Sequence, residues 1–137
     1  MFLGDLMNAL EINVLVLAYL GDTIYENYVR KFLIYQKIGN VNELQKQATN
    51  YVSAKNQAKF LQTMIDEHFL LEQELDVVKR ARNYKTTSHP KNCDIITYKY
   101  ATGLEALIGY LELVNKRQRI DEIMNYILGG TNNVSVR

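Results

Sequence analysis

Two acidic residues interrupt the most apolar stretches of the sequence and are the first candidates for chemistry. Asp22 lies within LAYLGDTIY, and Glu105 lies within ATGLEALIGYL between Gly103 and Gly109, small residues that allow close backbone approach. An unpaired carboxylate is costly to bury, so each acid requires compensation. If the two side chains meet in space, they can share a divalent cation, because carboxylate oxygens are the ligands that Mg²⁺ prefers.

A second interpretation gives each acid a structural role, as the partner of a basic side chain or as the cap of a neighbouring helix. The spacing alone favours neither interpretation. The sequence has no phosphate-binding glycine loop, no paired-histidine zinc motif and no nucleophile elbow. His68 and His89 are isolated and are expected at the surface. The search for chemistry therefore rests on Asp22 and Glu105.

Helical periodicity indicates the elements that must position these acids. The sequence contains one proline and no convincing alternation of apolar and polar residues, so it predicts an all-α fold. A first helix is expected from the cap Asn13 across VLVLAYLGDTIYENYVRKFLI, and it carries Asp22. Its buried stripe is expected to consist of Leu17, Leu20, Ile24 and Tyr28.

Five further helices are predicted in the same way. One should begin after Asn40, with Glu43 at the capping-box position, and another after Ser53. A fourth is expected at about 71–82. A fifth, at about 95–113, carries Glu105, and its inward positions are expected to be Ala101, Leu104, Ile108 and Leu111. A sixth, at about 118–128, should end at Gly129 and Gly130.

The composition indicates one domain outside any membrane. The chain has 137 residues, of which 47% are hydrophobic, and this is enough for a single core over residues 1–128, with 129–137 expected to fray. The lone Cys93 has no partner for an internal disulfide, which fits a reducing compartment and predicts a cytoplasmic protein. The N-terminus lacks a basic leader, and Asp22 and Glu26 interrupt the longest apolar stretch. We expect neither secretion nor membrane insertion.

A basic segment precedes the helix of Glu105. The formal net charge is only +1, so any surface for nucleic acid must be local. From Lys79 to Cys93 there is no acidic residue, and the segment contains the only proline, Pro90, within the long polar loop NYKTTSHPKNCD. Its basic residues are Lys79, Arg80, Arg82, Lys85, His89 and Lys91. They could form a solvated face or linker, or they could contact phosphates.

Three stretches resemble the ribonuclease III family. LGDTIYENYV around Asp22 is similar to the family's signature motif, in which the aspartate binds metal, and ATGLEALIGYLEL around Glu105 is similar to its second motif, in which a glutamate completes the site. The whole chain resembles Mini-III, the reduced branch of this family, including an RNxK stretch formed by Arg82, Asn83 and Lys85. The order of the two motifs, their separation along the chain and their expected helical setting are also similar to those of the family.

The resemblance implies a bundle of about six to seven helices that cleaves double-stranded RNA with Mg²⁺, for which Mn²⁺ could substitute. It implies that Asp22 and Glu105 are catalytic metal ligands. It further implies a homodimer that acts on precursor 23S ribosomal RNA, with help from a large-subunit ribosomal protein. RNA contacts are expected from the basic segment, through Lys79, Arg80, Arg82, Asn83, Lys85 and Lys91.

The sequence also departs from the typical ribonuclease III pattern. Two further acids of the first motif correspond to Leu15 and Ala18, and an aspartate expected before the glutamate falls on Thr102. Glu26 could stand near the metal as an outer partner, or it could be an ordinary exposed acid. The 137 residues include no recognisable double-stranded RNA-binding module, so we expect the catalytic domain to contact RNA itself. The reduced acid set keeps a second hypothesis open, a non-catalytic RNA-binding or ribosome-assembly adaptor with the same fold.

Overall fold

The computed structural model describes residues 8–86 and 88–129, and all the regular structure in these ranges is helical. A short 3-10 helix, η2 (Ala9–Glu11), which the sequence did not predict, precedes six α-helices. These are α1 (Val14–Tyr35), α2 (Val41–Val52), α3 (Ala54–Asp66), α4 (Glu72–Arg82), α5 (Ile95–Leu113) and α6 (Arg117–Gly129). The all-α prediction is confirmed, and the predicted frayed tail lies outside the described residues except for Gly129, which ends α6.

Side-chain caps fix where the helices begin. The Asn13 side chain accepts the Leu15 N–H at 2.7 Å, and Ser53 accepts the Asn56 N–H at 3.3 Å. Asn40 accepts the Glu43 N–H at 3.1 Å, but the Glu43 side chain does not complete the predicted capping box because it accepts from Gln47 at 2.8 Å. The helix starts that depend on these three caps are therefore confirmed.

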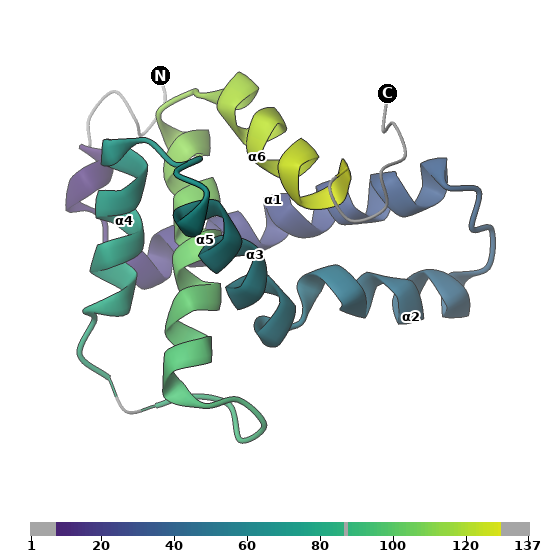
Figure 1. Cartoon of the computed structure of the whole chain (residues 1–137), viewed down its shortest axis with the longest axis horizontal. Coiled ribbons are helices and arrows are strands. Elements are labelled where there is room, and N and C mark those ends of the chain that lie inside the picture. Colours follow the sequence, from purple (N-terminus) through teal and green to yellow (C-terminus); the bar gives the residue numbers. More distant parts are fainter. Residues whose placement is uncertain (1–7, 87, 130–137) are drawn as a thin grey trace.

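Helix α5 forms the centre of the molecule. In Figure 1, α1 crosses α5, α4 lies alongside it, and α3 packs against it, while α1 and α2 continue to one side as a hairpin. The four predicted inward positions of α5 are all buried: Ala101, Leu104, Ile108 and Leu111. No helix in the described part of the chain is long and apolar enough to cross a membrane. Glu105 thus lies on α5, the most buried helix of the fold.

The predicted buried stripe of α1 is only partly correct. Leu17 is fully buried, but Leu20, Ile24 and Tyr28 are half-buried at its flank. The line of closest packing instead runs through Leu17, Gly21, Tyr25 and Val29. The reason is that glycine, which a hydrophobic pattern does not count, lies at the point where α5 comes nearest.

Two glycines allow the backbones of α1 and α5 to touch. A Cβ atom added at Gly21 would lie 1.7 Å from the carbonyl oxygen of Glu105, and one added at Gly109 would lie 2.0 Å from that of Leu17. Any side chain at either position would overlap main-chain atoms, which cannot move aside by changing rotamer. The crossing therefore sets the main chain of Glu105 directly against the turn of α1 that carries Asp22.

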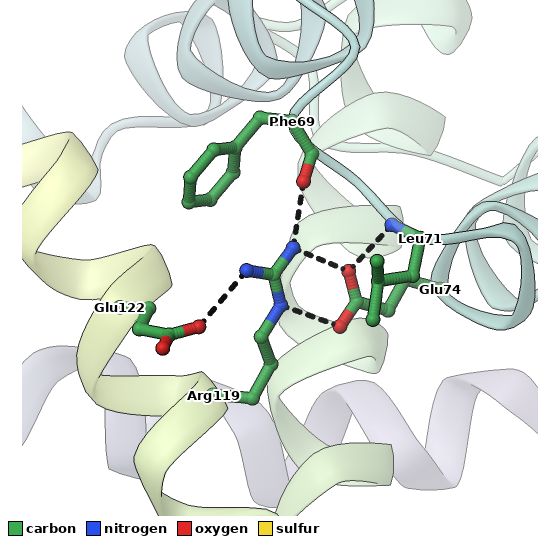
Figure 2. Close-up of polar contacts among 5 residues, drawn as sticks. All are labelled: Phe69, Leu71, Glu74, Arg119 and Glu122. Atoms are coloured by element: carbon green, nitrogen blue, oxygen red, sulfur yellow. Dashed lines mark hydrogen bonds and ion pairs between the residues drawn. The ribbon is translucent and has the colours of Figure 1, made fainter.

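A buried ion pair fastens α6 to the start of α4 (Figure 2). The Arg119 guanidinium donates to both oxygens of Glu74, at 2.7 and 2.9 Å, although Glu74 is only 2% exposed. Arg119 also donates to the Phe69 carbonyl at 2.7 Å, and Glu74 accepts the Leu71 N–H at 2.9 Å. This network satisfies the buried carboxylate, and its loss would leave an uncompensated charge in the core.

We predict that Gly21→Ala and Gly109→Ala each destabilise the protein by about 3 kcal/mol or more, at or beyond the upper end of overpacking costs. Chemical denaturation monitored by helical circular dichroism measures the change.

Gly103→Ala is the matched control, because its Cβ would meet only side-chain atoms at 3.5 Å or farther. That variant should be neutral or more stable by up to about 1 kcal/mol, the helix-propensity difference. Equal stability of all three variants would contradict the proposed backbone contact.

Candidate active site

The crossing of α1 and α5 brings the two predicted acids together. The carboxyl groups of Asp22 and Glu105 lie close enough to share a hydrogen bond, although the residues are far apart in sequence. Glu105 is half-buried between the helices, whereas Asp22 is exposed. The expectation that both acids are buried was therefore wrong for Asp22, which lies at the open edge of the contact.

Burial and a second carboxyl group make Glu105 an unusual acid. Desolvation, the hydrogen bond with Asp22 and the Asp22 charge raise the pKa of Glu105 to about 8, while a hydrogen bond from Gln57 lowers it. Without a compensating cation, the pair therefore tends to hold a proton at neutral pH. A bound cation would allow both groups to ionise, because its charge would offset the repulsion between the two carboxylates.

The residues present fit a magnesium ion with open coordination positions. Mg²⁺ in phosphoryl-transfer sites is typically held by one or two carboxylates, with water and substrate phosphates supplying the remaining oxygens. Asp22 and Glu105 provide two carboxylates, one of which reaches solvent. Within the described ranges, no group of three or more His, Cys, Asp or Glu residues is arranged to enclose a metal. The donor set suits a site completed by substrate.

The structural alternative for these acids finds little support. The ion pairs between described residues use Glu26, Glu74, Glu112 and Glu122, and neither Asp22 nor Glu105 forms one. Neither acid caps a described helix. The contact that both acids do make is with each other.

Glu26 lies near the acids but is engaged elsewhere. Its carboxylate pairs with Arg30 at 2.8 Å, one turn farther along α1, while its charge still contributes to the raised pKa of Glu105. Among the positions where a typical family member has acids, Ala18 and Thr102 are buried, and Leu15 is half-buried. The described carboxylates in hydrogen-bond contact at this site are therefore Asp22 and Glu105.

Two residues that the sequence analysis did not select surround Glu105. Gln57 on α3 is 3% exposed, and its side-chain Nε2 donates to Glu105 Oε2 at 3.4 Å. Tyr25 is fully buried, its hydroxyl donates to the Tyr51 carbonyl at 2.6 Å, and burial together with the nearby Glu105 charge raises its pKa. One signal was available for Gln57: it shares a helical stripe with the apolar Leu61 and Met64.

The basic segment divides into exposed cations and one anchored arginine. Lys79, Arg82, Asn83, Lys85 and Lys91 are exposed. Arg80 is half-buried, and its Nη2 donates to the Ile12 carbonyl at 2.5 Å, which joins α4 to the segment before α1. An open crevice at this junction is lined by Asn13, Val14, Lys79, Arg80, Asn83 and Tyr84. Arg80 therefore has a structural contact in addition to its predicted contact with RNA.

Residues 15–116 of this all-α domain, which include the two crossing helices and both acids, match the Ribonuclease III domain family, so the class is that of the ribonuclease III-type nucleases. The chain belongs to the Mini-ribonuclease 3 branch of that family. It is thus a ribonuclease of the hydrolase class, as the resemblance implied.

The comparisons behind this assignment cover most of the chain. It is 43% identical to the Mini-ribonuclease 3 of Enterococcus faecalis, over 86% of this chain and 89% of that protein. It is 53% identical to the Mini-ribonuclease 3 of Brevibacillus brevis, over 82% of each. A crystal structure of a Fusobacterium nucleatum protein superposes with a TM-score of 0.79 at 34% identity, and covers 88% of this chain and 98% of the other. The curated relatives thus agree on the family, and the solved structure shows that this fold occurs in another protein.

Proposed function

We propose that this protein is a Mg²⁺-dependent endoribonuclease that cleaves double-stranded RNA, with Mn²⁺ as a possible substitute for Mg²⁺. The observation that carries the proposal is the meeting of the Asp22 and Glu105 carboxyl groups at the α1–α5 crossing. The proposed substrate is the paired ends of precursor 23S ribosomal RNA in the bacterial cytoplasm, presented with the help of a large-subunit ribosomal protein. The Mini-ribonuclease 3 relatives support the ribonuclease activity in this proposal.

In the proposed reaction, Asp22 and Glu105 would hold the cation through their carboxylates. When bound, Mg²⁺ would supply water activation for in-line attack on the phosphodiester and stabilisation of the leaving oxygen. Glu105 must give up its proton when the cation binds, because its pKa is raised to about 8 in the metal-free protein. The exposed Asp22 leaves the site open to substrate. Neither acid has to act as the general base.

We predict that Asp22→Asn and Glu105→Gln each reduce cleavage of duplex RNA at least about 100-fold, since an amide keeps the shape but loses the charge that holds Mg²⁺. Single-turnover cleavage of a labelled duplex over a Mg²⁺ series measures the loss. A non-catalytic adaptor would bind the duplex and leave it intact even as the wild type, and that result would exclude the proposed activity.

Thermal unfolding in EDTA provides the fold control for these variants. Because the folded-state pKa of Glu105 is raised from 4.5 to about 8, the folded wild-type protein holds an extra proton between these values and loses stability as the pH rises through them. Glu105→Gln removes this dependence. The Glu105→Gln variant should therefore be at least as stable as the wild type near pH 8. Loss of cleavage in this variant would then result from loss of the carboxylate and not from unfolding.

We propose that the exposed cations at the end of α4 and in the following loop bind the RNA backbone. Lys79, Arg82 and Lys85 form no ion pair with a described residue, so their charges are available to phosphates. Asn83 and Lys91, also predicted to contact RNA, are exposed as well. Arg80 contributes charge there while it anchors α4 to Ile12.

Replacing Lys79, Arg82 and Lys85 together with alanine should weaken duplex binding and reduce the slope of log K against log salt by up to about 3, one unit for each lost phosphate contact. Arg80 is left in place because its removal would disturb the fold. Binding is measured in Ca²⁺ across a salt series. Replacement of Lys31 on α1, Lys46 on α2 and Lys116 in the turn before α6, all exposed, serves as the charge-matched control. Identical slopes for the two triple variants would favour the linker interpretation.

We further propose a homodimer formed through the exposed face of α1. Val16 and Tyr19 are 56% and 83% exposed there, one to two turns before Asp22. A two-fold contact through this apolar face would bring two sites to one duplex, one for each strand. Tyr19→Asp should therefore convert the dimer to a monomer in sedimentation and abolish paired cuts. A wild-type monomer with full activity at micromolar concentration would rule out this arrangement.

A further inference from the structure

A buried glutamine on α3 has no evident role in the core. Gln57 is 3% exposed and lies on the same stripe as Leu61 and Met64, where an apolar side chain would be expected. The other buried polar or charged residues of the described chain are Glu74, which pairs with Arg119, and Thr102. Burying an amide costs free energy unless its hydrogen bonds are replaced. The polar group that faces Gln57 is the carboxylate of Glu105.

The fold fixes Gln57 relative to both helices of the site. Its side-chain Nε2 donates to Glu105 Oε2 at 3.4 Å. The junction between α2 and α3 is held against α1 by the hydrogen bond from the Tyr25 hydroxyl to the Tyr51 carbonyl, at 2.6 Å. The Ser53 cap then begins α3 one turn before Gln57. The amide that contacts Glu105 is therefore buried, whereas Asp22, the other partner of Glu105, is exposed.

We propose that Gln57 is a positioning residue for the metal site, which holds Oε2 of Glu105 so that the other carboxylate oxygen is presented toward Asp22 and the cation. The inference rests on the proposed metal-dependent function. An amide suits this task because it directs a carboxylate without neutralising it. A lysine or arginine in its place would pair with Glu105 and compete with the cation, and an apolar side chain would leave the carboxylate free to rotate.

The test compares Gln57→Met with Gln62→Met. Methionine keeps the length of glutamine and removes the donor. Gln62 is the matched control, because it is on the same helix and its amide also donates to a carboxylate, that of Asp66 at 2.9 Å, but it is exposed and away from the site. Three quantities are measured. They are the Mn²⁺ affinity, determined by electron paramagnetic resonance, the Mg²⁺ concentration for half-maximal cleavage, and the melting temperature in EDTA.

We expect Gln57→Met to weaken Mn²⁺ binding and raise the half-maximal Mg²⁺ concentration about 10- to 100-fold, the usual range for loss of an outer-sphere partner. Cleavage at saturating Mg²⁺ should recover to within a few fold of wild type. The melting temperature should not fall, because an apolar side chain replaces a buried amide whose hydrogen bond to Glu105 is long, at 3.4 Å. Gln62→Met should match the wild type in every measurement.

Two results would overturn the inference. One is wild-type Mn²⁺ affinity in Gln57→Met. The other is a fall in melting temperature with lost cleavage that no Mg²⁺ concentration restores, which would make Gln57 a packing residue. Gln57→Leu is measured in parallel, so that a folding defect particular to methionine does not decide the matter. If the wild type binds Mn²⁺ but does not cut duplex RNA, the proposed function fails while the Mn²⁺ measurement still tests Gln57.

Discussion

The structure depends on a direct contact between the backbone of α1 and the backbone of α5. Gly21 and Gly109 let α1 and α5 approach until the carbonyl oxygens of Glu105 and Leu17 occupy the space where side chains would otherwise stand. Helices that cross with ordinary side chains between them keep their axes about 8–10 Å apart. The closer crossing brings a carboxyl group on each helix within hydrogen-bond reach. Absent side chains at two positions therefore create the site as directly as the acids do.

The same contact creates an electrostatic conflict that the protein does not resolve internally. Burial and the neighbouring Asp22 both disfavour the ionised form of Glu105, and no described cationic side chain pairs with either acid. The nearby Glu26 adds to the negative charge, although Arg30 partly compensates it. A site that is destabilised without a cation and open to solvent on the Asp22 side is well suited to a cation that also needs ligands from its substrate.

The helices and the identity of the two acids could be predicted from the sequence because their signals are local. Asn13, Asn40 and Ser53 mark helix starts within three residues of the atoms that they contact. The exposure of Asp22 could not be predicted, because it depends on where α5 crosses α1. The buried stripe was misplaced for the same reason, since Gly21 carries no hydrophobic signal. The contacts of Gln57 with Glu105 and of Glu74 with Arg119 join positions 48 and 45 residues apart, which no local pattern encodes.

The ion pair between Arg119 and Glu74 has a consequence for the order in which the chain becomes a protein. During synthesis, α4 and its Glu74 leave the ribosome well before Arg119 does, so the carboxylate has no guanidinium to meet when the first helices assemble. A buried charge without its partner is costly, and the start of α4 should therefore stay loosely packed at that stage. The charge of Glu74 is compensated once α6 brings Arg119 against it. A chain truncated before α6 should therefore keep Glu74 without its partner and be less stable than the whole chain.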